Sequence, residues 1–181
     1  MLPYDSKPAG VIRSIRQRWL FGLWDRARSG ADIPHWSKLQ ASDLASCFDC
    51  LNFIKAFHLN GALRFQILAH GQQIGVMFGK ASCAGKFLDE VIPKSGLQAN
   101  LESYNQAVQL KTPIYTTSNA TAVDGMPVVY ERLLLPFSES RDQVTHIIGM
   151  LEPMSTEGKF DRRNLFSSGM AEQLTVKASI K

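Results

Sequence analysis

The sequence predicts an α+β fold in which helices cover one face of an antiparallel β-sheet. Two turn signals lead to this prediction, because Asn60-Gly61 and Asp124-Gly125 each lie between runs rich in apolar, β-branched or aromatic residues. Both pairs tolerate positive φ, and such pairs between such runs favour β-hairpins. A long helical stretch separates the two groups of strands, and a crossover of this length allows both groups to join in one sheet.

Five strands are expected from the pattern, with helical segments between the second and the third. The expected strands are Leu51–Leu59, Leu63–Ala69, Pro113–Ala122, Val128–Phe137 and Val144–Leu151. Glycines interrupt residues 72–94, which indicates short helical turns. Ser95–Leu110 is a clearer helix, because its apolar residues recur at helical spacing and Pro113 follows its end.

An amphipathic helix is predicted over residues 9–29, ahead of the strands. Ile12, Ile15, Trp19 and Leu23 form its apolar stripe, which Trp24 widens. We therefore divide the chain into an N-terminal helix and connector (1–34), one α+β domain (35–154) and a polar, partly disordered tail (155–181).

The positive charge of the chain is concentrated in its first thirty residues. The net charge is +4, and residues 1–30 contain six basic and two acidic residues, whereas the remaining charges balance. Such a segment could meet an acidic protein, a membrane surface or nucleic acid. The predicted helix places its aromatic residues on the apolar stripe, away from most arginines, and this disfavours nucleic acid.

Other features of the sequence narrow the class of protein. The longest apolar runs are too short to span a bilayer, and the N-terminus has no apolar signal segment. Three cysteines, an odd number, suggest free thiols and a cytoplasmic location. The sequence contains no phosphate loop, dinucleotide fingerprint, serine-hydrolase elbow or zinc-protease motif, so we expect no enzyme activity and name no catalytic residue.

Cys47-x-x-Cys50 is the sharpest local motif in the chain. Two thiolates at this spacing could form half of a zinc site or a redox pair. The motif precedes a strand rather than opening a helix, and Cys83 and the scattered histidines are not spaced as further ligands. We therefore interpret these cysteines as core residues and predict no metal site.

Several segments give the chain a resemblance to a bacterial single-domain PAS-like family, formerly a domain of unknown function. The clearest is Tyr130-Glu131-Arg132-Leu133-Leu134-Leu135-Pro136-Phe137, which Ile147–Leu151 follows. Trp19–Pro34, Leu51–Phe57 and the Phe78-Gly79-Lys80 segment through Gly85 to Leu88 also match, so the resemblance covers about residues 19–154. It implies a PAS-like five-stranded antiparallel sheet whose cup holds a small ligand or serves protein binding alone, without enzyme activity.

The resemblance leaves the cofactor unknown. The surroundings of Cys83 do not match a flavin-reactive motif, and residues 95–110 contain no histidine for haem, so the sequence supports neither group. If the cup holds a ligand, its walls are predicted at Phe65, Ile67, Phe78, Phe87, Leu101, Tyr104, Arg132 and Leu133. The alternative is that these residues fill the core.

The function predicted from the sequence is a stand-alone PAS-like sensory or regulatory module that acts in trans. Its contact with a protein partner, or with a second copy in a dimer, is predicted on the N-terminal helix at Ile12, Ile15, Trp19, Leu23 and Trp24. A ligand-free adaptor with a filled core is the alternative. A small-molecule enzyme and a nucleic-acid binder rank below both.

Overall fold

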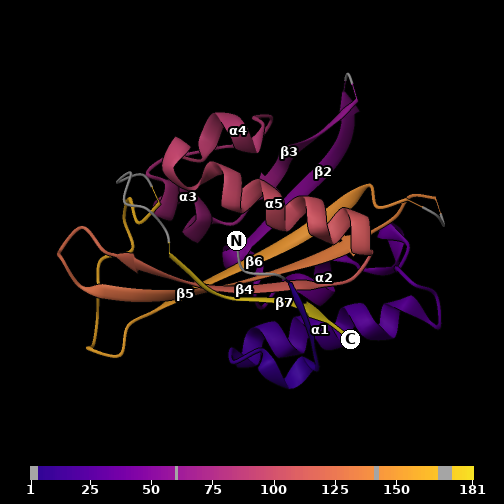
Figure 1. The fold of residues 1–181 in the computed structure, drawn as a ribbon, viewed down its shortest axis with the longest axis horizontal. Helices are drawn as coiled ribbons and strands as arrows, with labels where there is room; N and C mark the ends of the chain where they lie inside the picture. The colour runs from indigo at the N-terminus through magenta and orange to yellow at the C-terminus, as the bar shows by residue number, and fades with distance from the viewer. Residues whose placement is uncertain (1–3, 60, 141–142, 167–172) are drawn as a thin grey trace.

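A mixed β-sheet forms the centre of the molecule (Figure 1). The computed structural model describes residues 4–59, 61–140, 143–166 and 173–181. The strands are β1 (Asp5–Lys7), β2 (Leu51–Leu59), β3 (Ala62–His70), β4 (Ile114–Thr121), β5 (Pro127–Phe137), β6 (His146–Met154) and β7 (Gln173–Ile180). Their order in the sheet is β1-β7-β4-β5-β6-β2-β3, and β5 therefore lies at the middle.

Helices cover both faces of the sheet. Figure 1 shows α3, α4 and α5 on one side of the sheet and α1 and α2 on the other. The α-helices are α1 (Ile15–Arg28), α2 (Ala41–Leu44), α3 (Gln72–Phe78), α4 (Leu88–Val91) and α5 (Lys94–Leu110), and short 3-10 helices are η1 (Ala9–Val11), η2 (Trp36–Lys38) and η3 (Phe48–Cys50). We call the α3–α5 side of the sheet the cup side and the opposite side the α1 side.

The sheet contains two strands more than the five that the sequence predicts. β7 pairs antiparallel with β4, and β1 pairs parallel with β7 at the edge, so the sheet is mixed rather than fully antiparallel. The alternation of Val176, Ala178 and Ile180 with polar residues is a strand pattern in the segment interpreted as a tail. The expectation of a polar, partly disordered tail is therefore wrong for the strand region.

The segment before β7 also belongs to the fold. Leu165 and Phe166 are buried, and the Phe166 N–H donates to the carbonyl of Met77 at the end of α3, at 2.9 Å. The Phe166 ring contacts Phe78 and Tyr130. This segment thus closes one end of the cup, while residues 167–172 lie outside the described residues.

Helix α1 is fixed to the sheet along one face. Ser14 caps its first turn by accepting a hydrogen bond from the Gln17 N–H, and Leu20 and Trp24 are buried against the sheet. The Trp24 indole N–H donates to the carbonyl of Pro136 on β5, at 2.7 Å. Since these residues recur at helical spacing, α1 buries one stripe and leaves the other exposed.

Candidate functional site

A small cavity lies on the cup side, between the sheet and helices α3, α4 and α5. Its volume is about 20 Å³, which is room for about one water molecule. The lining residues are Asn52, Phe78, Leu88, Ile92, Pro93, Asn100, Tyr104, Tyr130, Arg132, Leu151 and Phe166. The wall is therefore apolar with a few converging polar groups, as is typical of ligand sites, but the space is far smaller than an organic cofactor needs.

Arg132 of β5 is the charged residue in this wall, and only 3% of its surface is exposed. Its guanidinium donates through Nη1 to Asn100 Oδ1 and through Nη2 to Ser103 Oγ, the latter at 3.0 Å. Both acceptors lie on α5, one turn apart. The Tyr104 ring centroid is 5.9 Å from the guanidinium carbon, and the buried Nε–H has no hydrogen-bond partner.

The partners of Arg132 are neutral. Among the residues that the structure describes, no carboxylate lies within 4.0 Å of its guanidinium. Buried charged side chains in proteins are normally paired with an opposite charge. Arg132 therefore combines deep burial, neutral neighbours and a donor without a partner at the edge of a cavity.

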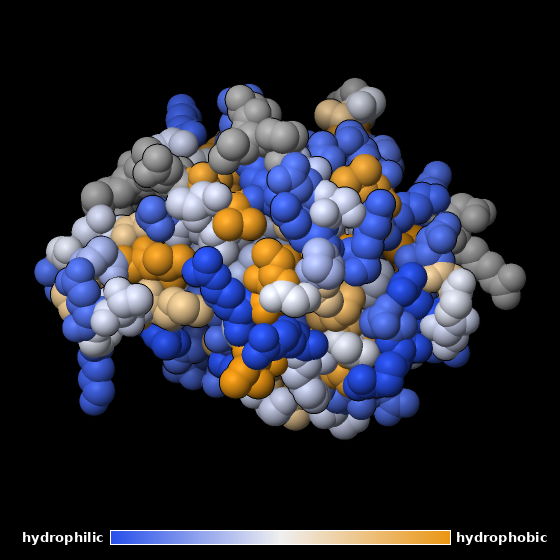
Figure 2. All heavy atoms as spheres, turned by 60° about the horizontal axis from the view of Figure 1, so that its bottom comes forward, coloured by the Kyte–Doolittle hydropathy of each residue, from blue (hydrophilic) through white to orange (hydrophobic). Residues whose placement is uncertain are grey.

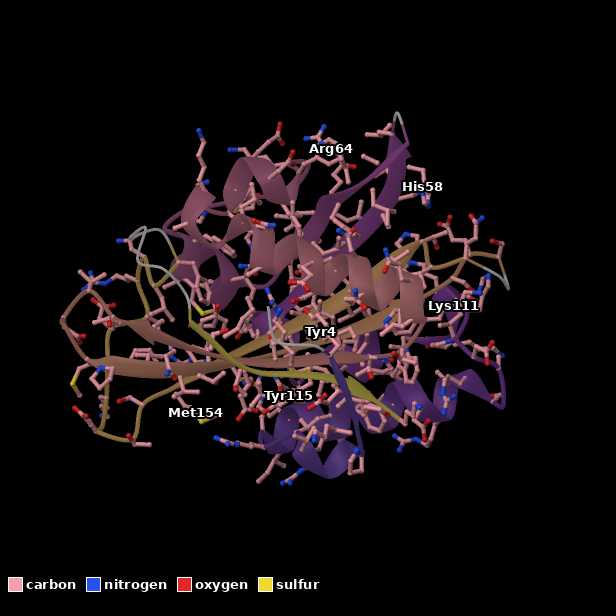
Figure 3. The ribbon with its side chains drawn as sticks, viewed as in Figure 1. Tyr4, His58, Arg64, Lys111, Tyr115 and Met154 are labelled. Atoms are coloured by element: carbon pink, nitrogen blue, oxygen red, sulfur yellow. The ribbon has the colours of Figure 1, made fainter. Side chains whose placement is uncertain are left out.

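A second polar group extends from this site toward β1 and β7. Tyr4 and Ser103 share a hydrogen bond of 2.8 Å, and the buried Lys177 ammonium pairs with Glu102 of α5 at 3.0 Å. Figure 3 places Tyr4 in front of the sheet beside α5. Burial raises the pKa of Tyr4 above its usual value, so its hydroxyl stays protonated at neutral pH. Strand β7 and Tyr4, the residue before β1, thus add polar groups to the cup side beside α5.

The α1 side of β5 carries the opposite charge. Glu131 is fully buried and accepts a hydrogen bond from the Ser14 N–H at the start of α1, at 3.0 Å. Its cross-strand neighbour Glu152 pairs with Arg16 at 2.9 Å. Figure 3 shows Tyr115 on this side of the sheet, where burial and the Glu131 carboxylate raise its pKa well above the usual range.

The structure brings together three of the eight residues predicted to line a pocket. Phe78, Tyr104 and Arg132 line the cavity. Phe65 and Ile67 are buried in the core, where Phe65 packs on the Tyr104 ring.

The other three predicted pocket residues lie elsewhere. Phe87 is half-buried under the Arg64 guanidinium. Leu101 is half-buried against the core, in a groove of α5 that Gln98 and Asn105 also line. Leu133 points to the α1 side, because consecutive residues of a strand face opposite sides and Arg132 faces the cup. The prediction that Leu101 and Leu133 line the pocket is therefore wrong.

The predicted contact surface on the N-terminal helix divides in the same way. Ile12 and Trp24 are buried, and Leu23 is half-buried against the core. Ile15 and Trp19 are 76% and 41% exposed. These two residues are one helical turn apart, so we call them the α1 patch. The predicted separation of the helix aromatics from most arginines is incomplete, because Trp19 and Arg18 are both exposed and Arg28 Cζ lies 5.0 Å from the Trp24 ring centroid.

The cysteines are buried as free thiols. Burial raises the pKa of Cys47, of Cys50 and of Cys83, which lowers the thiolate fraction at neutral pH. Within the described ranges, no group of three or more cysteine, histidine or acidic side chains is positioned to hold a metal ion. Arg16 Nη1 lies 3.5 Å from Cys50 Sγ, so this pair contributes to the docking of α1.

Sequence reasoning missed several residues of the cavity wall. Asn52 and Asn100 are buried polar residues, and Phe166 comes from the segment interpreted as a tail. A signal existed for Phe166, because Leu165-Phe166 is an apolar pair in a polar stretch. No pattern in the sequence distinguishes Asn52 and Asn100 from surface asparagines.

A family model described as PAS domain matches residues 12–152, which is most of the chain. The chain belongs to the PAS domain family. This confirms the resemblance found in the sequence, and the α+β fold with helices over a sheet agrees with it. In the described part of this PAS protein, no helix is long and apolar enough to cross a membrane.

Solved structures give more distant similarities. The PAS protein is similar to the Vibrio cholerae VqmA dimer in the absence of target DNA, at 12% identity and a TM-score of 0.48, over 66% of this chain and 53% of that chain. It is similar to VqmA bound to DPO at 10% identity and a TM-score of 0.47, over 65% and 59%. The match thus spans little more than half the length of the VqmA chains.

A third similarity is to the PAS domain of a protein from Colwellia psychrerythraea, at 14% identity and a TM-score of 0.44. That alignment covers 63% of this chain and 96% of that chain. A search of curated proteins finds no match.

Proposed function

We propose that this PAS protein is a non-enzymatic regulatory module that acts in trans by binding a protein partner through the α1 patch. The observation that carries the proposal is the division of α1 into a fixed stripe and an exposed one. Leu20 and Trp24 hold the helix on the sheet, whereas Ile15 and Trp19 face outward. A rigid helix with an exposed tryptophan suits protein binding, because little ordering is needed on contact.

The charge around the patch favours one kind of partner. Arg13 and Arg18 are exposed beside Ile15 and Trp19, and Arg26 lies further along the helix. Figure 2 shows the molecule from the α1 side, with hydrophobic side chains set among strongly hydrophilic ones. A second copy would bring a second set of arginines to the same contact. We therefore propose a partner whose surface has an apolar centre and acidic residues at its rim.

The filled cup also supports a regulatory rather than a catalytic role. A cavity of about 20 Å³ holds no space for an organic substrate. The Arg132 guanidinium that reaches it is engaged with Asn100 and Ser103 of α5 through Nη1 and Nη2. The adaptor form of the prediction therefore has better support than the form with a large ligand.

Partner binding is tested with a matched pair of serine substitutions. Trp19→Ser removes the centre of the patch, and Leu110→Ser removes an apolar residue of similar exposure at the end of α5. Proteins that co-purify with the wild type and Leu110→Ser, but are depleted with Trp19→Ser, are then purified and titrated directly. We expect Kd to rise at least tenfold for Trp19→Ser, and to rise with salt for the wild type.

Light scattering of the same three proteins separates the alternatives. If the wild type is a stable dimer and Trp19→Ser is a monomer, the partner at the α1 patch is a second copy of this chain rather than another protein. Equal binding by Trp19→Ser and the wild type would overturn the α1 patch as the contact surface.

A further inference from the structure

The positive charge of Arg132, which is buried beside the cavity, needs compensation. A guanidinium is always protonated, and transfer from water into a protein interior is unfavourable unless an opposite charge or strong hydrogen bonds compensate. In the described part of the chain, Arg132 has two neutral acceptors on α5 and the face of Tyr104. The nearby Glu102 is paired with Lys177 at 3.0 Å. Among the described residues, the positive charge of Arg132 thus has no counter-charge.

The hydrogen-bonding groups around the cavity are incomplete as well. The Arg132 Nε–H and the Asn52 Oδ1 are buried, line the same cavity and lack partners. Nearly all buried polar groups in proteins have a partner, so a bound species is expected in a cavity that two such groups line. A half-turn of the Asn52 amide exchanges its oxygen for its NH₂ group, and the site would then present donors from both residues.

We propose that this cavity binds a small monatomic anion, of the size of chloride, on Arg132. The volume of about 20 Å³ is room for one species little larger than water, so carboxylates and phosphates are excluded. Tyr104 and Leu151 provide the apolar part of the wall, which strengthens the attraction between the ion and the guanidinium by lowering the local dielectric. The inference deepens the proposed function by naming a ligand class, and it rests on that function only for its regulatory meaning.

The first test is anion-dependent thermal unfolding of the full chain. The protein is dialysed into sodium gluconate, whose anion is too large for the cavity, and gluconate is replaced stepwise by chloride or bromide. Sodium concentration stays constant, so general screening does not change. We expect a saturable rise of the melting temperature, about 5–10 °C at a hundredfold excess over Kd. A rise that is absent, or does not saturate, overturns the proposal.

Two arginine variants give the test its specificity. Arg132→Met keeps the length of the side chain but removes its charge, so the response to chloride should be lost. Arg64→Met is the control, because Arg64 is a surface residue paired with Asp89, and its response should match the wild type. An equal response in Arg132→Met would place the anion elsewhere and overturn the proposal.

A diffraction experiment on the wild type keeps the proposal falsifiable if Arg132→Met does not fold. Crystals grown in sodium bromide should show an anomalous peak in the cavity beside Arg132, and a water molecule there would overturn it. Trp19→Ser should retain the full response to chloride. If no anion binds but partner binding still depends on Trp19, the anion site is wrong and the proposed function stands. If an anion binds but partner binding does not depend on Trp19, the proposed function is wrong and the anion site stands.

Discussion

Each side of strand β5 buries a charged side chain, and the two sides surround that charge with different groups. Glu131 and Arg132 are neighbours in sequence, are both buried, and point to opposite faces of the sheet. On the α1 side, the Glu131 carboxylate meets a backbone N–H of Ser14 at the positive end of a helix. On the cup side, Arg132 meets neutral acceptors and a small cavity.

The difference indicates which side is structural and which side can respond. On the α1 side, hydrogen bonds from Ser14, Gln17 and Trp24 join the helix to β5, and apolar packing fills the rest. Glu131 Oε1 and Gln17 Oε1 are buried on that side without a partner as well, but neither residue lines the small cavity, whereas Arg132 and Asn52 do. The cup side has a buried positive charge, Arg132, without a counter-charge among the described residues. The stability of the protein should therefore depend on which anions are in solution.

The largest expected effect tests whether the α1 side is held by packing. Trp24→Ala removes a buried indole and its hydrogen bond to the Pro136 carbonyl, and we expect a loss of about 3–5 kcal/mol in the free energy of unfolding. Trp19→Ala, on the exposed stripe of the same helix, should change it by no more than about 0.5 kcal/mol. Urea unfolding followed by circular dichroism measures both. Similar losses in the two variants would mean that α1 has no preferred face.

The second comparison exchanges each buried charge for methionine, a side chain of similar length. Glu131→Met leaves the buried Ser14 N–H without an acceptor, so we expect a loss of about 1–3 kcal/mol. Arg132→Met removes a charge that has no counter-charge in the described part of the chain. In gluconate buffer its stability should lie within about 1 kcal/mol of the wild type, because relief from charge burial offsets the lost hydrogen bonds.

Chloride should separate these two variants. Wild type and Glu131→Met both retain the Arg132 site and should gain stability as chloride replaces gluconate, whereas Arg132→Met should not. Unfolding in urea at fixed sodium concentration measures the three proteins side by side. A large loss for Arg132→Met in gluconate would show that Asn100 and Ser103 compensate the charge fully, and the contrast between the two faces would disappear.

Much of this fold could be predicted from local pattern. The turn Gly61 has φ of 79° and Gly125 has φ of 85°, as their turn signals require, and the five predicted strands correspond to β2–β6. β7 was missed because its alternation is short and lies beyond a polar stretch. β1 is three residues long and becomes a strand only through its pairing with β7.

The site was harder to predict than the fold. Alternation separates Glu131 from Arg132 but does not say which helix covers which side, so Leu133 was assigned to the wrong face. The stripe of α1 was misjudged for a similar reason. Ile15 and Trp19 are as apolar as Leu20 and Trp24, and only the sheet decides which stripe is buried. Asn52 and Asn100 reach the cavity through tertiary packing, which local sequence does not specify.

A pH experiment sharpens the comparison on the α1 side. His146 of β6 is buried and stacked on Trp36, and its Nε2 lies 3.7 Å from Glu139. Burial lowers the pKa of His146 below its usual value of 6.5, and the Lys55 charge acts in the same direction, while Glu139 opposes it. The unfolded chain therefore binds a proton more readily, and stability present above pH 6.5 should decrease as the pH falls below that value.

His146→Phe should flatten this part of the pH profile, because phenylalanine does not titrate. His58→Gln is the control, since His58 is exposed near the tip of the β2–β3 hairpin in Figure 3, and its profile should follow the wild type. Urea unfolding between pH 5.5 and 7.5 measures the three slopes. A wild-type slope that persists in His146→Phe would assign the effect to another group.

The smallest expected effect asks whether Tyr4, the residue before β1, belongs to the anion site on the cup side or only borders it. Tyr4→Phe removes a hydroxyl that shares a hydrogen bond with Ser103, which also accepts from Arg132. We expect a loss of about 0.5–1.5 kcal/mol in urea unfolding, since the ring packing over Lys177 remains. If the Arg132 site binds an anion, the Kd for chloride should also change, because the hydroxyl orients the Ser103 acceptor. A loss of stability with unchanged Kd would mean that Tyr4 supports the cup side without affecting the anion site. No change in stability or in Kd would mean that its hydroxyl contributes to neither.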